Sequence, residues 1–450
     1  MVRHLLVVAF HFPPLASSGT FRTLSFVRHL ARLGWRSTVV TVGATSAAPL
    51  DEALLGKVPA GTRVVRAASG DPVAWLKRLA GRGGSGRGAA GGGAPAPNGA
   101  AASRRAGFAD TATRFLQIPD KESPFALSAA LAAVRASRGD GAPPDAVFAS
   151  GPPMSGLVAG ALAARALSCP FVADFRDPWT ANPFRDLPGA FLRSWDALLE
   201  RFVLATARVA ICNTSAARDA LAAAHPEIGP ERLAVIENGF DPDEMPAAAA
   251  PARPGGLTLL HAGVLYGRRD PTPLLAAVRD LLASDASLRG LLRVRFVGFP
   301  GDERFTPERL RAAAGDPGIV SVEGSVPHAA ALAEMAGADV LLLLGVTGAG
   351  PEVQVPAKLF EYLATGRPIF ATCHPRGAIA AVLRESSVRV FAAPPDDAAA
   401  IAAALRDLVA AFRRGELGRG PSALPERFDR ARQAESLDRR LRAACYLPPR

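Results

Sequence analysis

Cysteine, lysine and long apolar runs are scarce in this sequence. Four of its 450 residues are cysteine, namely Cys169, Cys212, Cys373 and Cys445. They are scattered and form no C-x-x-C pair, so we expect neither a zinc site nor a disulfide framework. No apolar stretch reaches the roughly 18 residues that a membrane-spanning helix needs, and the run at residues 5–10 is too short for a signal-peptide core. These absences predict a cytoplasmic protein with buried, reduced thiols.

The length and the apolar runs predict two domains of the α/β class. A chain of 450 residues with 49% hydrophobic content exceeds what one core usually supports. Strand-length apolar runs alternate with helical stretches in both halves, which is typical of doubly wound parallel sheets. We expect strands at residues 5–10, 37–42, 62–67, 145–149, 171–175 and 209–213, and then at 257–262, 292–297, 319–323, 340–344, 369–372 and 388–391.

Segments rich in proline and glycine divide the chain. Residues 246–256 consist of Pro, Ala, Arg and Gly and are typical of a linker. Residues 82–105 combine Gly, Ala, Ser and Pro with scattered Arg, which predicts a flexible insert. The predicted N-terminal domain therefore spans 1–245 and the predicted C-terminal domain 257–410, followed by a basic helix or tail at 411–450. Two such domains favour a ligand cleft where the carboxyl ends of their strands face each other.

The net charge of +11 is concentrated in two segments. Residues 76–114 carry seven basic residues and one acidic residue, and residues 411–450 carry ten arginines and five acidic residues. Positive charge confined to an insert and a tail fits an anionic membrane surface better than a groove lined for nucleic acid. A nucleic-acid partner is therefore not expected. The alternative is an arginine-rich composition that serves no partner.

The segment at residues 350–368, G-P-E-V-Q-V-P-A-K-L-F-E-Y-L-A-T-G-R-P, is the most informative part of the sequence. It follows the apolar run at 338–344 and predicts a helix that ends at Gly366. The amino end of such a helix attracts anions. Lys358, one of only four lysines, lies in its first turn, and Glu361 lies one turn later on the same face. This order suits a diphosphate followed by a ribose, although an ordinary surface helix is the alternative.

Further polar residues are expected at the same cleft. The first strand is followed by F-P-P-L-A-S-S-G-T and not by G-x-G-x-x-G, which argues against a dinucleotide-dependent oxidoreductase. Gly19 in that loop allows a close approach before a helix. Arg268 and Arg269 follow the turn at Gly263 and suit bidentate binding of diphosphate oxygens. Asp177 leaves the strand at 171–175 and could point into the cleft. Solvated arginines and a helix-capping Asp177 are the alternatives.

Several segments resemble a known family. The run P-A-K-L-F-E-Y-L-A-T-G-R-P looks like the donor-binding segment of glycosyltransferase family 4, and V-A-D-F-R-D-P-W, E-N-G-F-D and H-A-G-V-L-Y recur in the order seen in bacterial members. The resemblance implies the GT-B fold, with two Rossmann-like domains facing a central cleft. It also implies a retaining, metal-independent, front-face transfer of sugar from a nucleotide-diphosphate sugar to a glycan or lipid-linked acceptor, as in polysaccharide biosynthesis. No cofactor is implied.

The resemblance assigns two groups of site residues. The residues expected to act in catalysis are Asp177, Arg269 and Lys358. The residues expected to bind the donor, with the ribose at Glu361 and the base near His328, are Gly19, Gly263, Arg268, His328 and Glu361.

The chain departs from the family at one position. The family pattern has a second acidic residue eight before Glu361, where this sequence has Val353, and Glu352 is one residue out of register. The role of that acidic residue near the transferred sugar is therefore not assigned. The stretch D-P-D at 241–243 imitates a metal-binding D-x-D motif, but it follows an Asn-Gly turn and is interpreted as loop polarity. A sugar-nucleotide epimerase or hydrolase of the same fold and a non-catalytic nucleotide-sugar-binding protein are the alternative functions.

Overall fold

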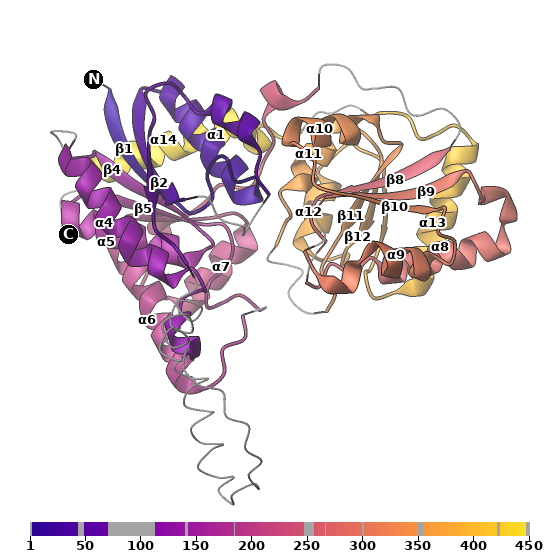
Figure 1. Ribbon diagram of the computed structural model, residues 1–450, viewed down its shortest axis with the longest axis horizontal. Coiled ribbons are helices and arrows are strands. Elements are labelled where there is room, and N and C mark those ends of the chain that lie inside the picture. Colours follow the sequence, from indigo (N-terminus) through magenta and orange to yellow (C-terminus); the bar gives the residue numbers. More distant parts are fainter. Residues whose placement is uncertain are drawn as a thin grey trace, which may run out of the picture.

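Two parallel sheets, each covered by helices on both faces, make up the computed structural model of the protein (Figure 1). The structure describes residues 2–43, 49–70, 113–139, 143–183, 185–246, 256–265, 267–298, 301–348, 354–420 and 424–446. The α/β class and the two Rossmann-like sheets expected from the sequence are confirmed. The predicted insert at 82–105 and nearly all of the predicted linker at 246–256 lie outside the described residues.

The first sheet has the strand order β3-β2-β1-β4-β5-β6-β7. Its strands are β1 (Arg3–Ala9), β2 (Trp35–Val42), β3 (Arg63–Ala67), β4 (Ala146–Gly151), β5 (Phe171–Phe175), β6 (Val209–Cys212) and β7 (Leu233–Val235). Its helices are α1 (Ser18–Arg32), α4 (Ser123–Gly139), α5 (Met154–Leu167), α6 (Ala190–Thr206) and α7 (Ser215–Ala224). Six strands overlap predicted ones. The prediction missed β7, because three residues at a sheet edge are too few to show a period.

Side chains of β1 alternate between the two faces of this sheet. Leu6 and Val8 join a core with α4 and α5, whereas Leu5 and Val7 join a core with α1 and the last helix of the chain. All four side chains are buried, which is why the strand reads as a continuous apolar run and not as an alternation.

The second sheet has the order β10-β9-β8-β11-β12-β13. Its strands are β8 (Leu257–Ala262), β9 (Leu292–Val297), β10 (Val320–Glu323), β11 (Val340–Leu344), β12 (Ile369–Thr372) and β13 (Val390–Ala393). Its helices are α8 (Thr272–Ser284), α9 (Pro307–Ala314), α10 (His328–Gly337), α11 (Lys358–Thr365), α12 (Ala378–Arg384) and α13 (Ala398–Arg413). All six predicted strands of this half are present, and β11 is buried along its whole length.

The last helix, α14 (Arg430–Tyr446), packs against the first sheet and not the second (Figure 1). Leu437 and Leu441 are fully buried in the core that contains Leu5 and Val7. Several arginines of the segment 411–450 form ion pairs: Arg413 pairs with Asp285 and Arg427 with Glu237 and Glu385 elsewhere in the protein, whereas Arg432 pairs with Glu435 and Arg442 with Asp438 within α14. Much of the positive charge of this segment is therefore engaged within the fold.

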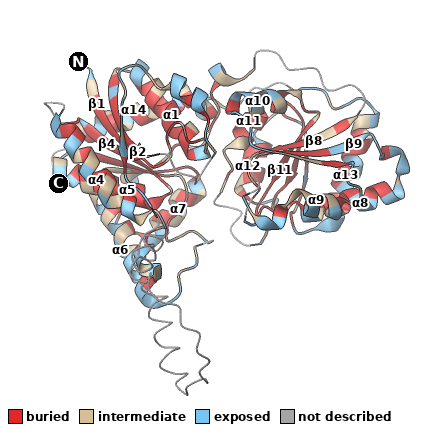
Figure 2. Ribbon diagram, viewed as in Figure 1, coloured by how far each residue is buried: buried red, intermediate tan, exposed pale blue. Residues whose placement is uncertain are grey.

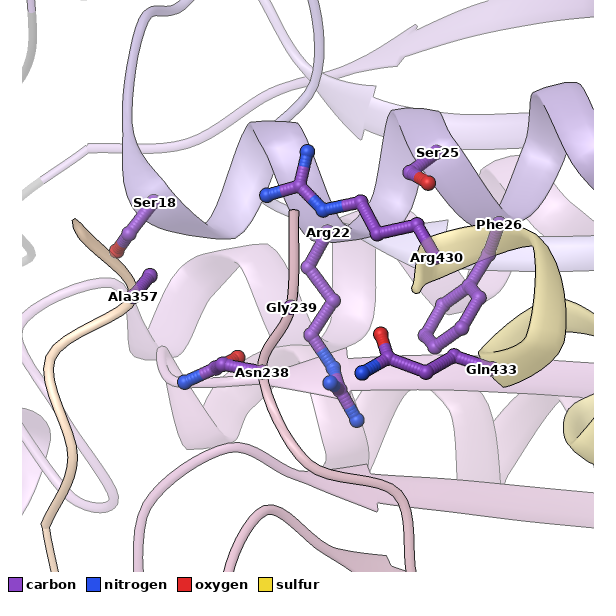
Figure 3. Close-up of a pocket in the computed structure, with 9 residues that line it drawn as sticks. All are labelled: Ser18, Arg22, Ser25, Phe26, Asn238, Gly239, Ala357, Arg430 and Gln433. Carbon is purple, nitrogen blue, oxygen red and sulfur yellow. The ribbon is translucent and has the colours of Figure 1, made fainter. Parts of the chain in front are cut away.

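The C-terminal segment returns from the second domain to the first, and it forms a tight junction between the two domains (Figure 3). The backbone N–H of Phe240 donates to the oxygen of Phe428 at 3.0 Å, and a Cβ on Gly239 would collide with that same oxygen. Arg22 of α1 and Gln433 of α14 lie around this crossing. The cavity there measures about 10 Å³, room for one water molecule and not for a nucleotide. It is lined by Ser18, Arg22, Ser25, Phe26, Asn238, Gly239, Ala357, Arg430 and Gln433.

Across the residues that the structure describes, no helix is both long enough and apolar enough to cross a membrane.

Candidate active site

Helix α11 carries the two charged residues that the sequence singled out. Lys358 is its first residue, Glu361 lies one turn later, and Gly366 ends it in the left-handed conformation with φ of 69°. Six of its eight residues are buried, so the helix is fixed against the sheet. The loop residues 349–353 before it, including Glu352 and Val353, lie outside the described residues.

Lys358 contacts a histidine that the sequence analysis did not assign. Its Nζ lies 3.0 Å from Nε2 of His261, at the end of β8, and Nδ1 of His261 lies 3.0 Å from the carbonyl oxygen of Leu342. Because a carbonyl only accepts hydrogen bonds, Nδ1 donates and Nε2 is left to accept from Lys358. Burial and the neighbouring Lys358 hold the pKa of His261 well below its usual value, so the ring is neutral. Burial and the charge of Arg269 lower the pKa of Lys358 to about 7.

Gly263 makes room for the Lys358 side chain. Its φ of 119° disfavours any residue with a side chain, and a Cβ at this position would lie 2.6 Å from Nζ of Lys358. The sequence analysis assigned Gly263 to a turn and to donor binding, and the structure places the lysine head group beside it.

The two adjacent arginines point to different places. Arg269 is buried, and its charge acts on Lys358 and on Asp177. Arg268 is exposed, its carbonyl oxygen accepts from the backbone of Thr347, and its guanidinium lies beside Gly348. The structure therefore brings Arg269, but not Arg268, to the Lys358 cluster.

Glu361 binds His328, the first residue of α10. Oε1 of Glu361 accepts from Nε2 of His328 at 3.0 Å. Burial acts to raise the pKa of Glu361, but His328, Arg430 and Lys358 outweigh it and the pKa is lowered. The carboxylate that was expected to hold a ribose thus remains ionised and faces the candidate base-binding residue.

His328 also joins the two domains. Its backbone N–H donates to Oδ2 of Asp51 at 3.0 Å, and its ring stacks on Phe21 of α1 with centroids 4.0 Å apart. Its Nδ1 lies 3.5 Å from Oε2 of Glu244. The first domain therefore contributes an aromatic face and two carboxylates beside the helix pair that carries His328 and Glu361.

Asp174 and Asp177, at and just beyond the end of β5, have different surroundings. Asp174 is fully buried and forms two hydrogen bonds with Arg22, at 3.0 Å and 2.8 Å, and accepts a third from Ser150. This makes it a structural residue. Asp177 lines a cavity, and its Oδ1 lies 3.4 Å from Nε2 of Gln354 in the second domain. Burial raises its pKa despite the charges of Arg176 and Arg269.

Gly19 is the second residue of α1, and a Cβ on it would collide with the guanidinium of Arg176. That guanidinium donates to the carbonyl oxygen of Pro152. The close approach predicted at Gly19 is therefore one between Gly19 and Arg176 of the protein itself.

A cavity of about 290 Å³ lies in the first domain next to Asp177. Two buried polar atoms near it, Nδ1 of His11 and Oδ1 of Asp120, have no hydrogen-bond partner within the described part of the chain. The other carboxylate oxygen of Asp120 accepts from the backbone of Ser155 in the first turn of α5, so this residue also caps that helix. The lining residues are His11, Asp120, Glu122, Pro152, Pro153, Met154, Asp177, Pro178, Trp179, Asn182 and Arg185.

Comparison with known protein families identifies the family of the chain. Residues 19–239 match the model of a glycosyl transferase 4-like domain, and residues 256–411 match the model of glycosyl transferases group 1. The two matches follow each other along the chain and together span most of it. The chain belongs to glycosyltransferase family 4.

Solved structures agree on the fold of this glycosyltransferase. A glycosyltransferase from Rickettsia africae superposes with a TM-score of 0.63 at 12% identity, covering 99% of both chains. A trehalose-6-phosphate protein from E. coli bound with UDP-2-fluoro glucose gives 0.63 at 12% identity, covering 99% of this chain and 100% of that one. A sucrose-phosphate synthase from Thermosynechococcus elongatus gives 0.60 at 15% identity, covering 98% and 100%. The GT-B fold is thus confirmed. No curated protein matches the sequence significantly.

Sequence reasoning missed several residues of this candidate site. His261 belongs to the motif H-A-G-V-L-Y, but nothing in its spacing reveals that it touches Lys358. Asp51 and Phe21 lie far from His328 in the sequence and meet it only across the domain boundary. The D-P-D stretch forms ion pairs within the protein, in which Asp241 pairs with Arg28 and His29. The four cysteines are free, and two of them are buried.

Proposed function

We propose that this glycosyltransferase moves a sugar from a nucleotide-diphosphate sugar to a glycan or lipid-linked acceptor, with retention at the anomeric carbon and without a metal ion. We further propose that it does so at the cytoplasmic face of a membrane, in polysaccharide biosynthesis. One observation carries the proposal: the buried Arg269, which follows β8, acts through its charge both on Lys358 at the start of α11 and on Asp177, which follows β5 of the other sheet. Two cations and a carboxylate at such a junction suit a diphosphate next to a sugar.

Lys358 and Arg269 stabilise the departing diphosphate in this proposal. The bond between the anomeric carbon and the diphosphate oxygen breaks, and its electron pair stays on the phosphate. Cations fixed before the reaction stabilise this growing charge more than the ground state. Because they are protein side chains, no metal is required. Glu361 accepts hydrogen bonds from the ribose, and His328 lies where the base would bind.

The acceptor enters from the first domain, where the cavity beside Asp177 lies. Its hydroxyl oxygen forms the new bond on the face of the anomeric carbon from which the diphosphate leaves, and its proton passes to a diphosphate oxygen. Asp177 accepts a hydrogen bond from the transferred sugar. This front-face route needs no protein nucleophile, because the departing diphosphate itself takes up the proton of the acceptor.

The first experiment identifies the donor. A panel of nucleotide sugars is screened by thermal shift, since a ligand at one hundred times its dissociation constant stabilises the fold by about 2.7 kcal/mol.

The variants Lys358→Ala, Arg269→Ala and the double variant are then compared in steady-state kinetics. Each single change is expected to lower kcat more than it weakens donor binding, and the double variant to lose less than the sum, because both cations act on one charge. Effects confined to KM, or fully additive losses, would refute a shared diphosphate.

The same assays separate the alternative functions. Donor hydrolysis or C2 epimerisation in the absence of any acceptor indicates an epimerase or hydrolase. Tight donor binding without turnover on any acceptor indicates a binding protein, for which the missing acidic residue at Val353 would provide a reason.

A further inference from the structure

The cavity beside Asp177 has about the volume of one sugar ring. It measures about 290 Å³, which lies near the lower end of the range of roughly 300–1,000 Å³ that small-molecule sites occupy. Liquid water fills about 30 Å³ per molecule, so the cavity has room for on the order of ten heavy atoms. A pyranose with its hydroxyl groups is of this size, whereas a chain of sugars is not.

Apolar residues form one part of the cavity wall. Pro152, Pro153, Met154 and Pro178 line it. Strand β5 is buried along its whole length, and helix α5, which begins at Met154, along most of its length (Figure 2). This wall is therefore held in place by the core of the first domain. The C–H face of a sugar ring packs against such a surface, while its hydroxyl groups need polar partners.

Two polar atoms at the cavity are buried without a hydrogen-bond partner within the described part of the chain, Nδ1 of His11 and Oδ1 of Asp120. The other carboxylate oxygen of Asp120 accepts from the backbone N–H of Ser155 at 2.9 Å. This bond fixes the carboxylate, so Oδ1 is not free to turn toward another residue. Because an unpaired buried acceptor is costly, a ligand hydroxyl that donates to Oδ1 gains binding free energy there.

Acidic side chains outnumber basic ones around the cavity. Among the described residues that line it, Asp120, Glu122 and Asp177 are acidic and Arg185 is basic. Burial raises the pKa of both Asp120 and Asp177, so negative charge is already unfavourable there. A phosphate or carboxylate group would add a further negative charge beside them. A hydroxyl group adds none and donates to the carboxylates.

The nearby cations bind the protein itself. The guanidinium of Arg185 donates to both carboxylate oxygens of Asp196 at 2.6 Å. Arg176, whose charge acts on His11, donates to the carbonyl oxygen of Pro152. Burial and the charge of Arg176 lower the pKa of His11 to about 3, so its ring is neutral. These contacts favour a neutral ligand, because anion recognition relies on cations whose donors face the ligand.

We propose that this cavity selects an acceptor whose terminal residue is an uncharged sugar, and that Asp120 and His11 determine the selection by hydrogen bonding to its hydroxyl groups. The inference rests on the proposed function and deepens it, because it names the class of acceptor and excludes a lipid phosphate or an acidic sugar from the cavity. For a lipid-linked acceptor, a transfer of a neutral sugar onto the lipid carrier must therefore come first. Asp120 acts in specificity and not in the chemical step.

Binding of simple glycosides to the full-length protein tests the selection without any donor. Saturation-transfer NMR is recorded with the methyl glycosides of glucose, galactose, mannose, rhamnose and N-acetylglucosamine. Methyl glucuronoside and methyl galacturonoside serve as anionic counterparts, and methyl glucosaminide as a cationic one. The tightest ligand should be a neutral glycoside, and the anionic glycosides should bind about tenfold more weakly than it does. A charged glycoside as the tightest ligand, or no binding of any neutral one, would overturn the proposal.

Asp120→Asn tests the buried oxygen. The variant keeps the size of the side chain and still accepts from the backbone of Ser155, but it presents an NH₂ group to the cavity. It should bind the tightest glycoside about tenfold more weakly, because a donor then faces the hydroxyl of the ligand. The matched control is Asp397→Asn, since Asp397 caps α13 by accepting from the backbone of Ala400 at 2.9 Å but lies exposed in the second domain. The control should bind as the parent does, and unchanged binding in Asp120→Asn would refute the selection by Asp120.

His11 provides a second test that does not depend on a helix cap. His11→Leu removes the ring nitrogens and should weaken glycoside binding about tenfold. His11→Asn places a polar atom near the position of Nδ1 and should keep most of the affinity. Equal affinities in these two variants would contradict the role of His11.

Two measurements separate this inference from the proposed function. Nucleotide sugars are screened by thermal shift on every variant, and Asp120→Asn should leave donor affinity unchanged while it raises KM for the acceptor glycoside. A protein that binds a nucleotide sugar but no neutral glycoside refutes this inference alone. A protein that binds neutral glycosides but no nucleotide sugar refutes the proposed function.

Discussion

The lowered pKa of Lys358 predicts that donor affinity depends on pH. In the empty site this pKa is about 7, because the ammonium is buried and Arg269 lies nearby. A bound diphosphate compensates both effects and restores a pKa near the ordinary value. Protonation of Lys358 and binding of the diphosphate are therefore linked. As pH rises through 7, the lysine of the free protein becomes neutral, and binding must first supply it with a proton.

The magnitude follows from the pKa. Affinity should be nearly constant below pH 6 and fall tenfold per pH unit well above 7, since one unit corresponds to about 1.4 kcal/mol. Between pH 6 and pH 8.5 the loss amounts to roughly thirtyfold, or about 2 kcal/mol. Glu361 and His261 do not interfere, because both have lowered pKa values and so keep one charge state throughout this range. In the unliganded protein, the same lowered pKa also affects folding stability. The free energy of unfolding rises with pH between pH 7 and the ordinary lysine pKa of the unfolded chain, because in that range the unfolded chain keeps a proton on this lysine and the folded chain does not.

Calorimetry provides the assay, with the nucleotide sugar that the thermal-shift screen selects. Titrations in two buffers of different ionisation enthalpy give the number of protons taken up, which should rise from about 0.1 at pH 6 through about one half at pH 7 toward one at pH 8.5. Lys358→Arg is the matched control, because an arginine cannot lose its proton in this range. It should bind more weakly at pH 6 and show no pH dependence. A pH-independent parent, or the same proton uptake in Lys358→Arg, would refute the reasoning.

Three further predictions test the packing around the site. Gly263→Ala should destabilise the fold by about 1–3 kcal/mol through backbone strain, and it should also weaken donor binding, because its Cβ meets Lys358. The control is Gly290→Ala, at a φ of 81° with open space around it. This control should lower stability in thermal denaturation through strain alone and leave the affinity measured by calorimetry unchanged. Glu361→Ala should weaken nucleotide binding by about 2–3 kcal/mol, and an unchanged affinity in a folded variant would remove Glu361 from the site. Arg22→Met leaves Asp174 buried without its cation and should lower the free energy of unfolding in urea by about 3–5 kcal/mol; a loss below 1 kcal/mol would contradict the structural role of the pair.

Local signals in the sequence were sufficient for the sheets and for helix α11. Continuous apolar runs marked twelve of the thirteen strands, because parallel strands buried on both faces leave no polar alternation. Lys358, Glu361 and the stop at Gly366 occupy the positions expected of them because helix geometry and end signals depend on residues a few positions apart. The family motifs added the GT-B fold, which the likeness to solved structures confirms.

Contacts between distant segments were decided only by the tertiary structure. Nothing near His261 in the sequence shows that its ring accepts from Lys358, 97 residues away. The sequence also could not separate Asp174, held by Arg22, from Asp177, or Arg268 from the buried Arg269. Likewise, α14 returns to the first sheet because Leu437 and Leu441 complete a core that no local pattern identifies. Periodicity fixes which face of an element is apolar, but the partner of that face, and the pKa of each side chain enclosed there, depend on how the two domains pack.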